Sequence, residues 1–324
     1  MTNIDQYLEA ATRSNTRKSY RTAIEHFEVS WRGLLPATAD SVARYLADCA
    51  GDLATSTLEQ RLAALADWHV EQGFPDPTKA PIVRKVMRGI RALHPGRQKQ
   101  AKPLQLNELE KVVRWLDAAV ASARLSHDRG AELRHLRDKS LLLLGFWRGF
   151  RSDELSRLQV EGVEAKAAAG ITCFLGSTKG DRQNFGTAYK TPALLVLCPV
   201  DAYLEWVSAA QLNSGPVYRA IDRWGHIGDS ALHVDSIAPL LRAMLKAGGL
   251  DAVALYSPHS LRRGFANWAA SNGWDLKSLM EYVGWRDIKS ALRYLDASDP
   301  FRKGRIDRTI ARDTLVPQLS SSPI

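Results

Sequence analysis

The chain has 324 residues, of which 45% are hydrophobic and 24% charged, and its formal net charge is +9. This mixture is typical of globular proteins and excludes an intrinsically disordered or collagen-like chain. The length predicts two domains, since a domain usually has about 150 residues. The excess of Lys and Arg over Asp and Glu favours a polyanionic partner, with nucleic acid as the first candidate.

The sequence has no pattern of a membrane or secreted protein. The longest apolar run, residues 141–147, ends at Arg148 and is far shorter than the roughly 20 residues of a membrane span. The first residues lack the basic and apolar regions of a signal peptide. Cys49, Cys173 and Cys198 are far apart and form no CxxC pair, which argues against a disulfide framework or a zinc site. We therefore expect a cytoplasmic protein with no membrane partner.

Residues 1–94 have the pattern of an all-helical domain. Pro and Gly separate four predicted helices, over residues 16–31, 39–50, 56–73 and 79–93. Residues 56–59, Ser-Thr-Leu-Glu, form a capping-box pattern that predicts the start of the third helix. The domain is expected to be a small bundle of four or five helices.

A basic stretch without acidic residues lies between Asp76 and Glu108. Its first part is the predicted helix 79–93. Its second part, residues 95–103, begins and ends with proline and has no apolar periodicity, which predicts a linker between domains. A linker that crosses a phosphate backbone explains the missing acids better than a solvated tether does. The predicted phosphate contacts from these two parts are Arg84, Lys85, Arg88, Arg91, Arg97, Lys99 and Lys102.

Residues 104–299 have a mixed pattern, which predicts an α+β domain with a small antiparallel sheet and makes the whole chain mostly α. Helices are predicted over residues 107–126, 133–148, 200–212, 235–247, 259–273, 275–283 and 287–296. Strands are predicted over residues 160–163, 171–175, 185–189 and 193–197. Residues 300–324 fit an amphipathic helix followed by a tail.

Several familiar enzyme motifs are missing. The sequence contains no GxxxxGK[ST] loop, no HExxH and no GxSxG. No cluster of acidic residues, His or Cys has the spacing of metal ligands. We therefore predict neither a cofactor nor a metal, and ATP-driven chemistry has no support.

Two segments place arginine at the start of a predicted helix. Ser152 can cap a helix after the apolar run, which places Arg151 near a positive helix end. Pro258 suits the first turn of a later helix, on which His259 and Arg262 share one face. Taken singly, each has an ordinary explanation, a surface arginine or an exposed His-Arg pair.

A third segment covers residues 282–295. Gly284 is predicted to end one helix, and Asp287 to begin the next, which carries Tyr294. On their own, Trp285 and Tyr294 would be interpreted as core aromatic residues.

Together, and in this order, the segments resemble the tyrosine recombinase (phage integrase) family over nearly the whole chain. The resemblance implies that Tyr294 is the nucleophile, and that the catalytic residues around it are Arg151, Lys179, His259, Arg262 and Trp285. Lys179 lies on a turn between two predicted strands, as the catalytic lysine of the family does. Trp285 stands where the family usually has His, which resembles the Cre-type branch. A tryptophan can donate an N–H to a phosphate oxygen, but it cannot transfer a proton.

The resemblance implies a site-specific recombinase that works through a 3′-phosphotyrosyl intermediate, without ATP or metal. Fixed arginines would stabilise the phosphate charge, and Glu154 would orient a neighbouring group. His259 is the candidate base for Tyr294, and Lys179 the candidate acid for the leaving 5′-hydroxyl.

The implied partner is double-stranded DNA, held in a C-shaped clamp, with Arg263 as a further contact and the protein associated with the nucleoid. A homotetramer on two DNA sites is expected, with residues 300–324 docked on a neighbouring protomer or on their own domain. A type IB topoisomerase, a telomere resolvase and a non-catalytic DNA-binding protein of the same fold remain alternatives at this point.

Overall fold

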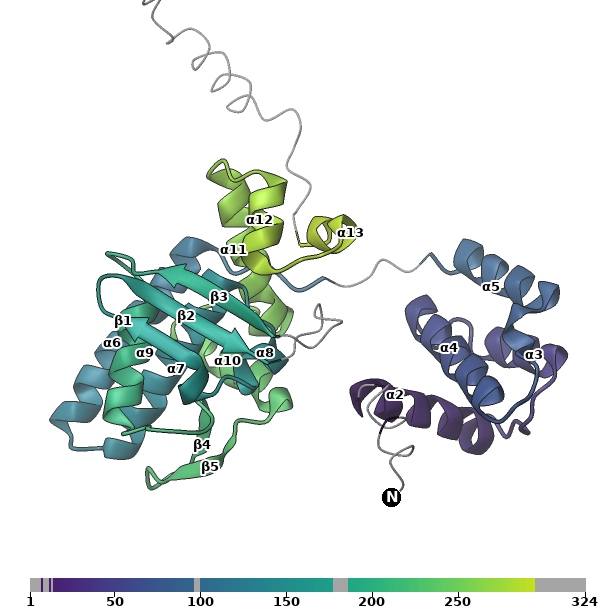
Figure 1. Cartoon of the computed structure of the whole chain (residues 1–324), viewed down its shortest axis with the longest axis horizontal. Helices are drawn as coiled ribbons and strands as arrows, with labels where there is room; N and C mark the ends of the chain where they lie inside the picture. Colours follow the sequence, from purple (N-terminus) through teal and green to yellow (C-terminus); the bar gives the residue numbers. More distant parts are fainter. Residues whose placement is uncertain (1–6, 8–11, 13, 96–99, 177–185, 295–324) are drawn as a thin grey trace, which may run out of the picture. The chain divides into compact units, whose positions relative to one another are not determined.

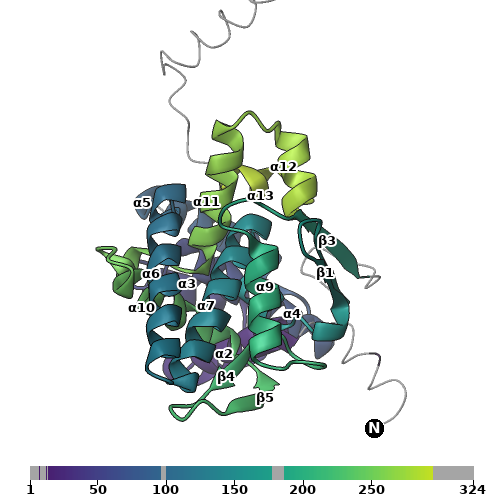
Figure 2. The same cartoon turned by 90° about the vertical axis from the view of Figure 1, so that its left-hand side faces the viewer.

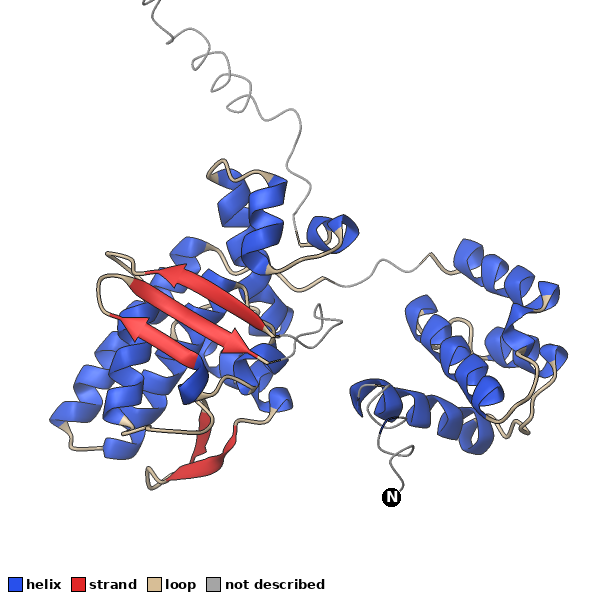
Figure 3. Ribbon diagram, viewed as in Figure 1, coloured by secondary structure: helices blue, strands red, loops and turns tan. Residues whose placement is uncertain are grey.

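The structure is a computed structural model that describes residues 7, 12, 14–95, 100–176 and 186–294 (Figure 1). The chain divides into two compact units, residues 1–99 and 100–324. Most described residues are helical, and the described strands all lie in the second unit (Figure 3). This confirms the expected architecture, mostly helical with small antiparallel sheets. Among the described residues, no helix is long and apolar enough to cross a membrane.

The first unit is helical where it is described. Its α-helices are α2 (Ser14–Glu25), α3 (Ala39–Asp48), α4 (Thr55–Glu71) and α5 (Pro81–Leu93). A π-helical turn, His26–Ser30, continues α2. The core contains Phe27, Tyr45, Leu58 and Val83, which are fully or almost fully buried. Burial of one apolar face of each helix therefore holds the unit together.

Three predicted helix starts in this unit were wrong by one or two residues, and the first of these helices, α2, begins at Ser14 instead of residue 16. α4 begins at Thr55 after Ala54, and no side chain caps it, so the capping-box pattern at residues 56–59 lies inside the first turn. The predicted helix 79–93 begins at Pro81, because a proline holds the preceding residue, Ala80, in an extended conformation.

In the second unit, α7 (Arg129–Arg148) is the central helix. It packs against α6 (Leu106–Leu125), α9 (Pro199–Ala209) and α11 (Pro258–Ser271), and Figure 2 shows α6, α7 and α9 side by side. The apolar run of α7 from Leu141 to Leu144 is fully buried, because three helices surround it. The other helices of the unit are α8 (Ser152–Ser156), α10 (Ile237–Ala247), α12 (Leu276–Val283) and α13 (Ile288–Leu292).

The sheet of this unit has the strand order β1 (Val163–Lys166), β2 (Gly170–Leu175) and β3 (Thr187–Pro192), all antiparallel. It contacts α7 and α9. The prediction of a strand over 193–197 was wrong, since Leu195 and Val196 lie exposed in a loop. The predicted strand at 160–163 is mostly a 3-10 turn that leads into β1.

A second hairpin was not predicted. It consists of β4 (Arg219–Ile221) and β5 (Ile227–Ala231). Both strands are short, and β5 is mostly exposed, so neither shows a strong alternating pattern.

Candidate active site

The first arginine lies at the junction of α7 and α8. Arg151 itself is the N-cap of α8, so the prediction that Ser152 caps this helix was wrong by one residue. Glu154 accepts hydrogen bonds from the backbone N–H of Arg151 at 2.7 Å and from Nη1 of Arg151 at 2.6 Å. The carboxylate is almost completely buried, whereas the Arg151 side chain is 25% exposed. A buried carboxylate therefore orients a guanidinium that solvent can reach.

The second arginine comes from α11. Ser257 caps this helix in a capping box with Ser260, as the sequence predicted for the cap. Arg262 is 1% exposed, and its Nη1 and Nη2 donate to the carbonyl oxygens of Gly149, at 2.6 Å, and Val283, at 3.3 Å. One side chain thus joins the ends of α7 and α12 to α11.

The third segment follows α12. Gly284 ends this helix in the left-handed conformation, with φ of 76°, which favours glycine. Asp287 caps α13 by accepting the N–H of Ser290, as predicted. The predicted helix 287–296 ends earlier, at Leu292, so Tyr294 lies two residues beyond α13 rather than on it. The tyrosine backbone N–H still donates to the carbonyl of Ala291 at 2.9 Å.

Helices α11, α12 and α13 lie together at one end of the second unit (Figures 1 and 2), and Tyr294 follows α13 in the sequence. The hydroxyl of Tyr294 is 3.1 Å from Nδ1 of His259. Its ring centroid lies 5.2 Å from that of Trp285 and 5.5 Å from the guanidinium carbon of Arg262. A phenol that follows α13 is therefore brought together with an imidazole and a buried cation that both come from α11.

The electrostatics of the site depend on the two arginines and Glu154. Burial, together with the positive charge of Arg151, lowers the pKa of Arg262 to about 10, although Glu154 opposes the shift. A carboxylate oxygen of Glu154 lies 3.7 Å from Nη1 of Arg262. Arg262 thus remains positively charged at neutral pH, and the site keeps two cations beside one carboxylate.

Two buried donors at the site stand out. Within the described ranges, neither Nε of Arg262 nor Nε1 of Trp285 has a hydrogen-bond partner. Buried donors usually have hydrogen-bond partners. A buried donor without a partner costs stability, and such donors are typical of functional sites. No group of three or more His, Cys, Asp or Glu side chains in the described part of the chain has the arrangement of a metal site.

The structure brings five of the six predicted catalytic residues together, namely Arg151, His259, Arg262, Trp285 and Tyr294. Lys179 lies outside the described residues, in the segment between β2 and β3. Arg97, Lys99 and the predicted helix 300–324 also lie outside them.

The predicted DNA contacts differ in their surroundings. Arg84, Lys85 and Arg88 are exposed on α5, and Arg91 is exposed but paired with Glu59 at 2.9 Å. These side chains lie opposite the buried face of the helix, as the apolar stripe predicted.

Two other predicted DNA contacts, Lys102 and Arg263, form interactions within the protein. Lys102 donates to Glu108 at 2.9 Å and lies over the ring of Tyr256. Arg263 is 5% exposed and bonds to Gln100 and to the carbonyl of Arg293. Contacts within the protein therefore account for the position of Arg263 without DNA.

A further cation lies near the site and was missed from the sequence. The guanidinium of Arg148 is buried between the rings of Tyr189 and Tyr282, at 4.8 and 4.1 Å from their centroids. Burial lowers the pKa of this arginine. The available signal was an arginine that directly follows the apolar run 141–147.

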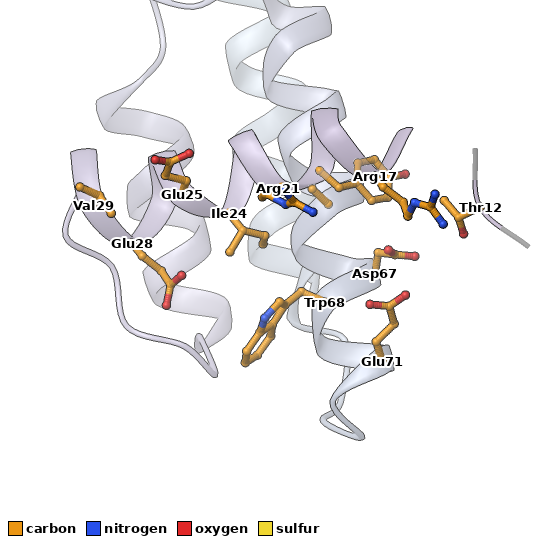
Figure 4. Close-up of a pocket in the computed structure, with 12 residues that line it drawn as sticks. Thr12, Arg17, Arg21, Ile24, Glu25, Glu28, Val29, Asp67, Trp68 and Glu71 are labelled. Atoms are coloured by element: carbon orange, nitrogen blue, oxygen red, sulfur yellow. The ribbon is translucent and has the colours of Figure 1, made fainter. Parts of the chain in front are cut away.

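The first unit contains a separate pocket of about 620 Å³ between α2 and α4 (Figure 4). Arg17 and Arg21 line it from α2, and Asp67, Trp68 and Glu71 from α4. None of the predicted site residues belongs to it.

Comparison with known proteins identifies related sequences. The "Integrase/recombinase xerD homolog" of Selenomonas ruminantium is 29% identical over 310 residues, which cover 93% of this chain and 87% of the relative. "Tyrosine recombinase XerD" of Rhizobium meliloti (strain 1021) is 26% identical over 296 residues, 88% and 86% of the two chains. "Recombinase cre" of Escherichia phage P1 is 24% identical over 280 residues, 82% and 77% of the two chains. Relatives named XerD and a relative named cre both match this chain, so its membership of the Cre-type branch stays a prediction.

Solved structures share the fold. The Tn1549 transposon integrase in complex with transposon right end DNA superposes with a TM-score of 0.60 at 12% identity, over 93% of this chain and 95% of that chain. The XerH site-specific recombinase bound to palindromic difH substrate gives a TM-score of 0.55 at 16% identity, over 91% and 78%. Residues 114–300, more than half of the chain, match the sequence profile of the Phage integrase family. The chain therefore belongs to the phage integrase family of tyrosine recombinases.

Proposed function

We propose that this protein is a site-specific DNA recombinase that cleaves and rejoins strands through a covalent bond to Tyr294. The observation that carries the proposal is the position of Tyr294, whose hydroxyl is 3.1 Å from a ring nitrogen of His259 and whose ring centroid is 5.5 Å from the buried guanidinium carbon of Arg262. A phenol has a pKa near 10, so it needs a base and positive charge nearby to act as a nucleophile at neutral pH. The site supplies both.

The reaction follows from the chemistry of these groups. Oη of Tyr294 attacks the phosphorus of a phosphodiester and passes its proton to His259. The bond between phosphorus and the 5′-oxygen breaks, and the departing 5′-hydroxyl takes a proton from Lys179. Attack of a 5′-hydroxyl from another strand reverses these steps, so the new ester forms without ATP.

The arginines and the tryptophan stabilise the charge that develops on the phosphate. Arg151 can meet a phosphate oxygen directly, since its side chain is partly exposed and Glu154 orients it. The guanidinium of Arg262 lies over the rings of Trp285 and Tyr294, so it supplies a buried positive charge beside the nucleophile. Trp285 adds one N–H donor.

DNA is the proposed partner of both units. The exposed basic face of α5 supplies phosphate contacts through Arg84, Lys85 and Arg88. DNA-bound complexes of proteins with this fold support the choice of partner. We further propose that four copies assemble on two DNA sites, with residues 300–324 docking on a neighbouring copy, and that the protein is associated with the nucleoid.

Covalent capture tests the nucleophile. Wild type, Tyr294→Phe and the control Tyr282→Phe are incubated with a DNA library in EDTA, quenched in SDS, and the protein-linked fragments are sequenced. Wild type and Tyr282→Phe should form adducts at one sequence, whereas Tyr294→Phe should bind DNA and form none. An adduct with Tyr294→Phe would refute the assignment.

The topology of the product tests the type of reaction. A supercoiled plasmid with two copies of the captured site should yield exchanged products, such as deletion circles or inversions. Relaxed circles from a plasmid with one site, without exchange, would indicate a topoisomerase instead.

A further inference from the structure

The chain enters the second unit along α11, the helix that carries His259 and Arg262. Backbone N–H groups of Lys102 and Leu104 donate to the carbonyls of Leu255 and Ser260, both at 3.0 Å. A Cβ built on Gly264 would overlap the carbonyl oxygen of Leu104, so glycine is needed for this close approach. The segment 100–104 is thus held against the catalytic helix by its own backbone.

Arg263 connects this segment to the region of the nucleophile. Its Nη1 donates to Oε1 of Gln100 and, at 3.1 Å, to the carbonyl oxygen of Arg293. An Nη atom carries two hydrogens, so it can make both bonds at once. Arg293 directly precedes Tyr294, and Gln100 is the first residue of the second unit. One nitrogen atom therefore joins the end of the linker to the residue before the tyrosine.

Among the described residues, the bond from Arg263 adds to the hydrogen bond between the Tyr294 N–H and the Ala291 carbonyl in holding the backbone near the tyrosine. The tyrosine follows α13, a helix of only five residues, Ile288–Leu292. Two apolar side chains of this helix, Ile288 and Leu292, are about half exposed. Ala291 is fully buried, but the first and last residues of α13 are half exposed, so the position of this short helix is sensitive to the bond that Arg293 accepts directly after it.

We propose that Arg263 is a positioning residue that couples the linker to Tyr294, so that cleavage is fast only while Gln100 holds the Arg263 side chain against the Arg293 carbonyl. This inference rests on the proposed function. Arg263 then acts inside the protein and does not contact DNA. The position of the linker affects how fast Tyr294 reacts. Displacement of Gln100 would remove one partner of the Arg263 guanidinium, weaken its bond to the Arg293 carbonyl and let the Tyr294 hydroxyl move away from His259.

Charge variants at Gln100 test the coupling in the full chain, because this side chain is exposed and its replacement leaves the core intact. The probe is a duplex with the captured site, nicked beside the scissile phosphate so that the cleaved strand dissociates. The rate of adduct formation is measured at saturating DNA, and the dissociation constant separately. Gln100→Glu should keep the wild-type rate or exceed it, because the carboxylate still accepts from Arg263. Gln100→Lys should slow cleavage roughly tenfold, as for residues of one hydrogen-bond network.

The predicted order of cleavage rates, with Gln100→Glu faster than Gln100→Lys, is the reverse of the order expected if the added charge acted only through DNA binding. A lysine in the linker should strengthen DNA affinity and a glutamate should weaken it. Equal cleavage rates for wild type, Gln100→Glu and Gln100→Lys at saturation would overturn the coupling. A wild type that forms no adduct at all would instead refute the proposed function.

Arg263→Lys distinguishes positioning from DNA contact. A lysine keeps the charge but does not reproduce the planar fork, so cleavage should slow while DNA affinity and its salt dependence stay unchanged. A second variant, Arg263→Gln, removes the charge, and a weaker DNA affinity with a salt slope lower by about 1 in this variant would show that Arg263 binds phosphate. The control is Arg134→Gln, which removes another guanidinium–carbonyl bond of the same unit, to Asp222 at 2.7 Å. It should lower thermal stability without changing the cleavage rate of the folded protein.

Discussion

Replacement of Gly264 by alanine should destabilise the second unit even though alanine favours helices. A Cβ at this position would overlap the carbonyl oxygen of Leu104 and lie 2.8 Å from Cε2 of Phe146. Real Cβ atoms essentially never approach other atoms within 3.0 Å, so the backbone at Leu104 must shift by roughly 1 Å. This shift breaks the bond from the Leu104 N–H to the carbonyl of Ser260 and strains that of Lys102.

The magnitude follows from these contacts. The loss of one buried backbone hydrogen bond and the strain in a second together cost about 1–3 kcal/mol. Crowding against Phe146 costs a further 1–3 kcal/mol or so, as in other overpacked cores. The higher helix propensity of alanine returns about 1 kcal/mol. We expect a net loss of about 3 kcal/mol, or about 6–12 °C in Tm for a unit of this size.

Gly89→Ala is the matched control. Gly89 also lies in the interior of a helix, α5, but a Cβ there would meet no atom within 4 Å. This variant should stabilise the first unit by about 0.5–1 kcal/mol. Hydrogen exchange followed by mass spectrometry separates the two units. Gly264→Ala should exchange faster in residues 100–105 and 258–271, and an exchange pattern identical to wild type would refute the reasoning.

Three further predictions concern the site, the linker and the DNA contacts. Trp285→Phe keeps the ring beside Tyr294 but removes the N–H, so single-turnover cleavage should fall roughly 100-fold or more without loss of DNA affinity; an unchanged rate would contradict a role for this donor. Burial opposes ionisation of Glu108, yet hydrogen bonds hold its pKa below 4.5. The carboxylate therefore stabilises the fold above pH 4.5, and this stability is lost as the pH falls through the lower pKa of the folded state. Glu108→Gln should lower Tm at neutral pH, and its Tm should fall less than that of wild type as the pH is lowered in thermal scans. A fall in Tm as steep as in wild type would show that other groups cause the acid sensitivity. Arg88→Ala should lower the slope of DNA affinity against salt by about 1. In the control, Arg44→Ala, the slope should stay nearly unchanged, because Arg44 lies on α3 and is paired with Asp40. Equal slopes in the two variants would exclude a phosphate contact of Arg88.

Local signals in the sequence determined most of the elements and the order of the motifs. His259 and Arg262 share a face because their spacing matches the helical repeat. Ser257, Gly284 and Asp287 mark helix ends through caps that involve only a few neighbouring residues, and all three predictions were confirmed. Such signals act within one turn of the chain, so a single sequence is enough to read them.

Only the tertiary structure decided which of these surfaces meet. Periodicity shows that residues lie on one face, but the partner of that face depends on packing between distant segments. The carbonyls of Gly149 and Val283 that hold Arg262 are therefore invisible in the sequence. The surroundings of Arg263 and Arg148 are another example, since arginine is usually exposed and both side chains are buried here. Residues 261–266 of α11 are buried, because α7 covers one face of this helix and the entering linker covers another. For this reason Arg263, which the sequence predicted as a DNA contact, forms its hydrogen bonds within the protein.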